Sequence, residues 1–414
     1  GITIKGAGIL DVLESYIATP TASAKTTTSE VATLNTTNLV LNTENRAVTF
    51  NATGANILVK NALQTSGANA ATFTLGSGSV LTLTGASPFS LAASTNTITF
   101  DNNSTVVYGA AVNQTINTTL SYKNISFSGA GTKQTGAGTL NVSGNWNSAG
   151  GKVNLTSGTV SFNGANQTIT DGGSDNDNGI IFGNISVSGG TKTLAGSGKF
   201  ALAIGRFLTL AANTILQTSD KLTLKASSLG SASVSAIPSS SSVQGNVTVE
   251  RYVQGGAKDM WRSYRMFSSP IYDNNNSSNR TYSFTQFIDN MLITGKSAGF
   301  DQINNSATGA WTYNNGFIAI PNINTAVDVG RGAYILYRGD RTNGAAKVSV
   351  PYVDPESIIM DFKGKLNQQD VHVPLTHGST TFSFLGNPYA ATIDWTLVQK
   401  SNVEATIRIW NPEK

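Results

Sequence analysis

The tetrapeptide Asn113-Gln-Thr-Ile116 returns downstream as Asn166-Gln-Thr-Ile169, and its surroundings return with it. Three further landmarks recur in the same order: Ser104-Thr-Val-Val-Tyr108 as Gly158-Thr-Val-Ser-Phe162, Asn124-Ile-Ser-Phe127 as Asn184-Ile-Ser-Val187, and Thr132-Lys133 as Thr191-Lys192. Asn113 and Asn166 are 53 residues apart, and Asn124 and Asn184 are 60 apart. The additional residues of the second copy lie in a polar insert at residues 171–179. Short alternating strands that recur between Gly, Ser, Thr and Asn corners predict a β-solenoid.

The same alternation runs from residue 39 to residue 224. An apolar, polar, apolar triplet buries two side chains and exposes one. Such triplets include Val48-Thr-Phe50, Phe73-Thr-Leu75, Leu81-Thr-Leu83, Leu140-Asn-Val142, Leu208-Thr-Leu210 and Leu222-Thr-Leu224. With roughly 20–25 residues in a turn and turns about 4.8 Å apart, we expect some ten turns of a right-handed parallel β-helix-like coil. Tandem β-sandwiches, with strands about 8–12 residues apart, are the alternative.

Composition favours sheets over helices. Charged residues make up 12% of the 414, and the chain has 42 glycines and no cysteine. Because glycine costs ~1 kcal/mol relative to alanine in a helix, we expect an all-β fold. The absence of cysteine excludes disulfides, thiol nucleophiles and thiolate metal sites.

Charge and hydropathy argue against two kinds of partner. The net charge is +4, but the basic residues never form a run of three, whereas nucleic-acid binding needs a basic patch. No run of about 18 apolar residues occurs, so we expect no membrane-spanning helix.

The chain opens with Gly1-Ile-Thr-Ile-Lys5, inside a pattern already under way, so we expect it to be a piece of a longer protein.

Composition changes near residue 243. Up to Ser242 there are 12 Lys+Arg and 9 Asp+Glu, leaving 15 and 14 for the last 172 residues, and four of the five Trp lie after the change. The predicted divisions are an N-terminal segment at 1–40, a solenoid at 41–235, a linker at 236–244, and a globular β-sandwich-like module at 245–414 that continues past Lys414.

Residues 9–17 fit two helical turns or a strand. Neither end of the solenoid shows an obvious cap, which favours pairing there.

In the module we expect a strand at 246–253, followed by 261–267 and a turn at 268–270, and further strands at 333–337, 347–350, 381–385 and 406–410.

The module resembles one found in large exported surface proteins of Bacteroidota. The resemblance is carried by Gly245-Asn-Val-Thr-Val-Glu-Arg-Tyr-Val253, Trp261-Arg-Ser-Tyr-Arg-Met-Phe-Ser-Ser-Pro270, and Phe384-Leu-Gly-Asn-Pro-Tyr389 followed by Ile393-Asp-Trp395. Such proteins place the module after Gly/Thr/Asn-rich β repeats and before a sorting domain for type IX secretion. The resemblance implies a secreted, adhesin-like cell-surface protein and, as partners, the type IX secretion and outer-membrane attachment machinery. It brings no catalytic residues with it.

A candidate metal site lies in Asp171-Gly-Gly-Ser-Asp-Asn-Asp-Asn-Gly179. Three carboxylates, Asp171, Asp175 and Asp177, and two amides stand on a Gly-rich loop, and Ca²⁺ prefers hard oxygen ligands of this kind. The alternative is a solvated insertion between two turns. We expect no other cofactor.

Candidate catalytic groups are few. Gly295-Lys-Ser-Ala-Gly299 matches a nucleophile elbow, but the sequel Phe300-Asp-Gln-Ile-Asn-Asn-Ser does not favour the helix that such an elbow needs. Asp370, His372 and His377 would share a metal only if the chain bends at Pro374. A polysaccharide lyase or glycoside hydrolase needs converging carboxylates, and Asp101 has no acidic neighbour in the adjoining turns.

Two surfaces are candidates for binding sugars. Trp311, Tyr313, Tyr334 and Tyr337 are a candidate stacking platform, although aromatic residues in such a module usually belong to the core. The outward Thr and Asn of the solenoid triplets, at residues 40–230, form a second candidate surface for polysaccharide. The sequons at Asn113, Asn124, Asn166 and Asn184 fall within the strand pattern, which indicates composition and not glycosylation. We expect a non-catalytic, extracellular surface protein, with a β-helical polysaccharide-degrading enzyme as the alternative.

Overall fold

The computed structural model describes residues 2–19, 25–173, 179–275, 280–303, 307–375, 382–409 and 411. Strands hold 50% of the chain and helices 4%, so the fold is all-β as predicted. The chain divides into unit 1, residues 1–201 with 209–217, and unit 2, residues 202–208 with 218–414. The helices of the described residues are four or five residues long, too short to cross a bilayer.

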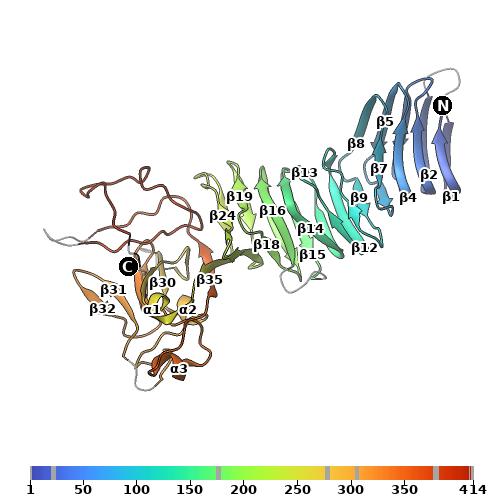
Figure 1. Ribbon diagram of the computed structural model, residues 1–414. Coiled ribbons are helices and arrows are strands. Elements are labelled where there is room, and N and C mark those ends of the chain that lie inside the picture. Colours follow the sequence, from blue (N-terminus) through green and yellow to red (C-terminus); the bar gives the residue numbers. More distant parts are fainter. Residues whose placement is uncertain are drawn as a thin grey trace. The chain divides into compact units, whose positions relative to one another are not determined.

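Unit 1 is a parallel β-solenoid (Figure 1). Its strands are β1 (Ile2–Ala18), β2 (Lys25–Asn42), β3 (Val48–Ala52), β4 (Asn56–Ser66), β5 (Ala70–Leu75), β6 (Val80–Leu83), β7 (Phe89–Leu91), β8 (Thr95–Phe100), β9 (Thr105–Tyr108), β10 (Gln114–Thr115), β11 (Ser121–Tyr122), β12 (Asn124–Gln134), β13 (Thr139–Val142), β14 (Trp146–Phe162), β15 (Gln167–Asp171), β16 (Ile180–Val187), β17 (Gly190–Gly196) and β20 (Thr214–Gln217). The paired strands run parallel, with Thr105 opposite Asn124 and Gln167 opposite Lys192. These offsets of 19 and 25 residues match the predicted turn length, and the chain makes about 9 turns. Parallel pairing rules out tandem antiparallel sandwiches here.

Residues 9–17, which fitted either a helix or a strand, are strand. They belong to β1, which aligns in parallel with β2, so that Ile9 lies opposite Thr33 and Ile17 opposite Val40. The segment is solenoid because its neighbour, 23 or 24 residues along, offers a matching row of backbone donors and acceptors.

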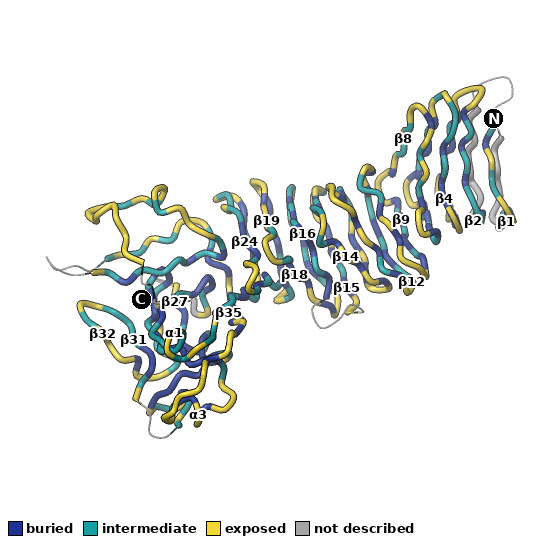
Figure 2. Tube along the Cα trace, viewed as in Figure 1, coloured by how far each residue is buried: buried dark blue, intermediate teal, exposed yellow. Residues whose placement is uncertain are grey.

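The triplets bury two residues of three, as predicted. Phe50, Phe73, Leu81 and Leu83 are fully buried, while the intervening Thr, Asn and Ser side chains are partly or fully exposed. Figure 2 shows this alternation along the strands of unit 1. Aromatic rings also stack from turn to turn: the centroids of Phe50 and Phe73 are 5.8 Å apart. Each added turn therefore lengthens the core without increasing its cross-section.

The recurring Asn-Gln-Thr-Ile sequence has a structural explanation. Gln114 and Gln167 are buried, and each side-chain amide bridges two backbone carbonyls of the preceding turn. Gln114 Nε2 donates to the carbonyl oxygens of Leu83 (2.9 Å) and Gly85 (2.8 Å), and Gln167 Nε2 to those of Val142 (3.0 Å) and Gly144. In the next turn Lys133 lies opposite Gln114, and Lys192 opposite Gln167. Each copy of the repeat thus spans two adjacent turns.

These two lysines are fully buried, and backbone carbonyls surround both ammonium groups. Lys133 Nζ donates to the carbonyl oxygens of Ala110 (2.8 Å), Gly129 (3.1 Å) and Gly131 (2.7 Å), and Lys192 Nζ to those of Gly164 (2.6 Å), Ala165 (3.4 Å), Ser188 (2.5 Å) and Gly189. Neither forms an ion pair within the described residues. Burial lowers the pKa of both groups, and that of Lys192 to about 8.

This shift predicts how stability depends on pH. Between pH 8 and the ordinary lysine value of 10.5, the unfolded chain binds a proton that folded Lys192 has released, so the contribution of Lys192 to stability rises with pH. The test measures the difference in urea midpoint between the wild-type chain and a Lys192→Met variant. This difference, wild type minus variant, should increase from pH 8 to pH 10.5 and stay level below pH 8. Lys152→Met, at an exposed lysine of β14, serves as control. A relative midpoint that falls with pH would contradict this.

Unit 2 continues with short strands and three helical turns. The strands are β21 (Leu222–Leu224), β22 (Ala226–Ser227), β23 (Gly230–Ser231), β24 (Ser233–Val234), β25 (Ser242–Gln244), β26 (Asn246–Val253), β27 (Tyr264–Phe267), β28 (Ile271–Tyr272), β29 (Asn274–Asn275), β30 (Arg280–Ser283), β31 (Ala310–Tyr313), β32 (Phe317–Ala319), β33 (Ala326–Asp328), β34 (Ala333–Leu336) and β35 (Ile358–Leu366); the helices are α1 (Lys258–Trp261), α2 (Thr285–Ile288) and α3 (Gly344–Val348). Phe287 of α2 lies in the core, with its ring 5.5 Å from that of Phe362.

Strand β26 changes the direction of pairing. It pairs in parallel with β21, as a solenoid strand does, and antiparallel with β35 on its other edge. The expectation of an uncapped solenoid is therefore wrong at this strand, because β35, more than 100 residues downstream, occupies the free edge. Residues 236–244 contain β25, and the side chain of Gln368 exchanges hydrogen bonds of 2.9 and 3.0 Å with the Val243 backbone.

Three strands expected in the module are not found. Residues 347–350 include the end of α3, where buried Lys347 pairs with Asp340 (2.7 Å) and Glu356 (2.6 Å). Within the described parts of 381–385 and 406–410 no strand forms, apart from a single bridge between Arg331 and Leu385. Residues 406–409 alternate like a strand but are exposed, and no described strand lies alongside to pair with them.

Candidate functional site

Unit 2 contains a four-stranded antiparallel sheet in the order β27-β34-β31-β32. Met266 lies opposite Tyr334, Tyr334 opposite Trp311, and Tyr313 opposite Phe317. The hairpin between β31 and β32 turns at Asn314-Asn315-Gly316, where Asn315 adopts a positive φ of 53°. Asn and Gly are the residues that tolerate such a turn, so this local sequence fixes the register that brings the aromatic residues together.

The two faces of this sheet differ. One face is buried at Arg265, Ala310, Ala333 and Ile335, although at its hairpin end Ile318, opposite Thr312, is 50% exposed. The other we call the aromatic face; it consists of Tyr264, Met266, Trp311, Tyr313, Phe317 and Tyr334. Each of these six side chains is partly or fully exposed, with Met266 at 43% and Phe317 at 53%. In Figure 2 the exposed and intermediate residues of β31 and β32 are visible along the hairpin.

Rings on the aromatic face pack against each other. Tyr334 stacks on Tyr264 with centroids 4.6 Å apart and planes 7° apart, and lies 4.7 Å from Phe317. Tyr313 meets Phe317 edge to face at 5.3 Å. Burial, with a further contribution from Tyr264, raises the pKa of Tyr334, so its hydroxyl stays protonated at neutral pH. The row therefore offers both apolar ring area and hydroxyl groups.

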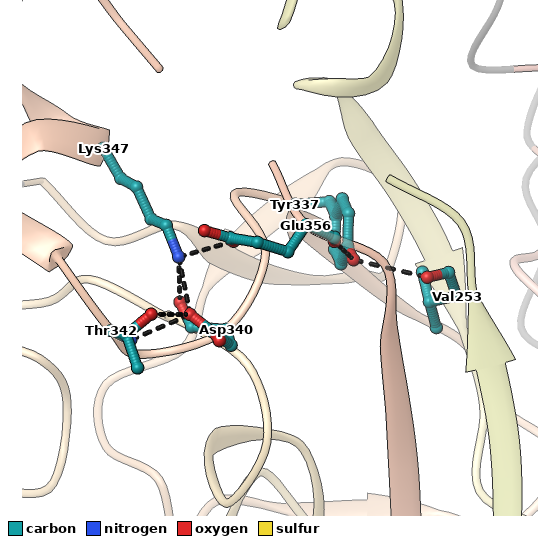
Figure 3. A network of polar contacts seen from close by, with 6 residues as sticks. All are labelled: Val253, Tyr337, Asp340, Thr342, Lys347 and Glu356. Carbon is teal, nitrogen blue, oxygen red and sulfur yellow. Dashed lines mark hydrogen bonds and ion pairs between the residues drawn. The ribbon is translucent and has the colours of Figure 1, made fainter. Parts of the chain in front are cut away.

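Of the four residues expected in a stacking platform, Tyr337 is not part of it. Tyr337 lies three residues after Tyr334, so it points to the opposite face, where it is fully buried. Its hydroxyl donates to the carbonyl oxygens of Val253 (3.4 Å) and Glu356, beside the Lys347 ion pairs (Figure 3). Tyr337 is a core residue. Trp311, Tyr313 and Tyr334 share one face as predicted, and Tyr264, Met266 and Phe317, which sequence reasoning missed, complete it.

The calcium prediction falls partly outside the described residues. Asp175 and Asp177 lie there, while Asp171 is buried and accepts hydrogen bonds from Ser148 Oγ (3.3 Å) and the Gly173 amide (3.2 Å). Among the described residues no three His, Asp or Glu side chains gather as metal ligands would. Calcium at Asp171, Asp175 and Asp177 stays a prediction.

The catalytic motifs are placed as follows. Residues 295–299 form a turn that follows an isolated bridge at Thr294 instead of a strand, and up to Ile303 no helix comes after it, as the sequence indicated for the helix. Asp370 and His372 are exposed, and His377 lies outside the described residues. Asp101 is exposed at the end of β8.

The sequon asparagines bridge neighbouring turns of unit 1. The side-chain oxygens of Asn113, Asn124 and Asn166 accept hydrogen bonds from the backbone amides of Thr132 (3.1 Å), Asn145 (2.8 Å) and Thr191 (3.0 Å). Asn184 Nδ2 donates to Thr159 Oγ1 at 3.4 Å. These asparagines therefore have a structural role, because each links two adjacent turns of the solenoid.

Comparisons of the chain with protein-family models, with curated proteins and with solved structures gave no match.

Proposed function

We propose that this chain is a non-catalytic, exported cell-surface protein of the adhesin type, in which unit 1 is a stiff spacer and unit 2 binds glycan through the aromatic face. The observation that carries the proposal is the partial exposure of six clustered side chains on one face of a sheet whose other face is buried along β27 and β34 at Arg265, Ala333 and Ile335. Soluble domains usually bury such residues, and exposed aromatic clusters mark binding surfaces.

The solenoid supports the spacer role. Backbone groups of the strands pair with those of adjacent turns, and buried Gln and Lys side chains bond to further backbone carbonyls. The outward Thr and Asn of the triplets remain a second candidate glycan surface.

Extracellular location, travel through type IX secretion and outer-membrane attachment belong to the same proposal and rest on the resemblance of residues 245–412. Right-handed coiling of the solenoid and β-sandwich-like packing of residues 245–414 are also part of it. The rival is a β-helical lyase or glycoside hydrolase.

A glycan array combined with a turnover assay distinguishes the non-catalytic adhesin from the polysaccharide-degrading enzyme. We expect the full chain to bind one class of polysaccharide and to release no reducing ends or unsaturated products from it, even after long incubation at high protein concentration. Sustained product release that is lost in an Asp101→Asn or Asp175→Asn variant would establish the enzyme instead. Absence of binding to any glycan would remove the adhesin proposal.

A further inference from the structure

Two arginines stand at one end of the aromatic face. Strands β27 and β34 are antiparallel with Tyr264 opposite Leu336. The ladder continues by one hydrogen bond, from the Tyr337 amide to the Ser263 carbonyl oxygen (2.9 Å). Just beyond this bond lie Arg262, which follows the last residue of α1, and Arg338, whose charge interacts with both Arg262 and the Tyr264 side chain of the aromatic face.

Neither arginine has a carboxylate partner among the described residues. Arg338 is 8% exposed; its Nη1 donates to Thr294 Oγ1 at 3.2 Å, and its Nε is buried without a partner. Arg262 packs over the Tyr352 ring at 3.7 Å, and its Nε is likewise buried and unpaired. By contrast, nearby Arg341 forms a 2.8 Å ion pair with Asp301.

This arrangement opposes folding. Like charges that lie close together repel, and buried guanidinium groups normally find an acid. Burial, reinforced by the positive charge of Arg262, lowers the pKa of Arg338 to about 10. The Arg338 guanidinium therefore stays charged at neutral pH, and an anion supplied from outside would relieve the repulsion.

We propose that the aromatic face and the pair Arg262 and Arg338 form one binding site for an acidic polysaccharide, whose sugar rings pack on the aromatic row while a uronic-acid carboxylate binds the arginines. This inference rests on the proposed glycan binding and adds the class of glycan. Charge complementarity selects the occupant, because a guanidinium fork matches a carboxylate in shape and charge. An acidic peptide would supply the carboxylate, but the apolar faces of pyranose rings match the aromatic row better.

The test uses oligogalacturonate and oligomannuronate, each beside its methyl-esterified form, which keeps the sugar rings and removes the charge. Calorimetric titration of the full chain should show at least one acid form binding about 10-fold or more tightly than its ester, with an advantage that shrinks as salt rises. Arg262→Gln should remove most of this advantage by lowering the affinity for the acid far more than the affinity for the ester. Arg280→Gln is the matched control, because Arg280 also lies over a tyrosine ring, that of Tyr272, at 5.2 Å.

The outcomes separate the two proposals. Equal affinity for acid and ester overturns the acidic-glycan inference and leaves glycan binding standing. Failure of the full chain to bind any glycan removes both. Binding of oligoglutamate as tight as that of the uronates would assign the site to an acidic peptide and overturn the inference. The ester is titrated into the same Arg262→Gln sample, so an unfolded variant would lose affinity for the ester as well as for the acid. In that case Arg262→Lys replaces it. Because lysine keeps the positive charge, Arg262→Lys should retain part of the preference for the acid.

Discussion

Replacing Gly131 by alanine should destabilise unit 1 by about 3–5 kcal/mol, more than most single substitutions do. Gly131 is buried in β12, and a Cβ built on it would lie 1.8 Å from the Val112 carbonyl oxygen in the preceding turn. Since that atom belongs to the backbone, no side-chain rotation relieves the clash, and adjacent turns must separate. The hydrogen bond from Lys133 Nζ to the Gly131 carbonyl would be disturbed with them.

Gly136 supplies the matched control, five residues further along. It is exposed, it has no positive φ, and a Cβ there would meet nothing within 4 Å. Gly136→Ala should therefore stay within about 0.5 kcal/mol of wild type. Equilibrium urea unfolding of the full chain, followed by far-ultraviolet circular dichroism and tryptophan fluorescence, compares the variants. Equal stability of Gly131→Ala and Gly136→Ala would mean that the turns do not stack in the register described.

The solenoid could be predicted because its information is local. Triplets such as Phe73-Thr-Leu75 specify a half-buried strand, and turn residues such as Gly54 and Gly78, both with positive φ, specify the corners. The Asn-Gln and Thr-Lys landmarks marked a pair of adjacent turns, although the sequence did not reveal that Gln114 and Lys133 are buried and bonded to carbonyls.

Unit 2 was harder to predict because its pairings are long-range. That β35 covers the edge of β26 depends on contacts across more than 100 residues, and the strand expected at 406–410 alternates correctly but lacks a neighbour. Of the aromatic residues, Trp311 and Tyr313 could be assigned to one face because they are two residues apart. The same rule would have removed Tyr337, three residues from Tyr334. The contribution of Tyr264 and Phe317 required the strand order, which the sequence did not contain.

Removing rings from the aromatic face should abolish most glycan binding without unfolding unit 2. In the double variant Trp311→Ala/Phe317→Ala, we expect the affinity for the tightest-binding array glycan to fall at least about 30-fold, because central aromatic residues commonly contribute 2 kcal/mol or more to a binding site. Both side chains are at least partly exposed, so the thermal midpoint should change little. Phe382→Ala is the control, since Phe382 is exposed to a similar degree (62%, against 53% for Phe317) and lies in none of the strands of this sheet.

The most direct measurement is calorimetric titration of that glycan into the wild-type chain, the double variant and Phe382→Ala under identical conditions. The account predicts wild-type affinity for Phe382→Ala and at least a 30-fold loss for the double variant, with both variants folded. Unchanged affinity in the double variant would contradict it, and would move the binding surface to the Thr and Asn side chains of the solenoid.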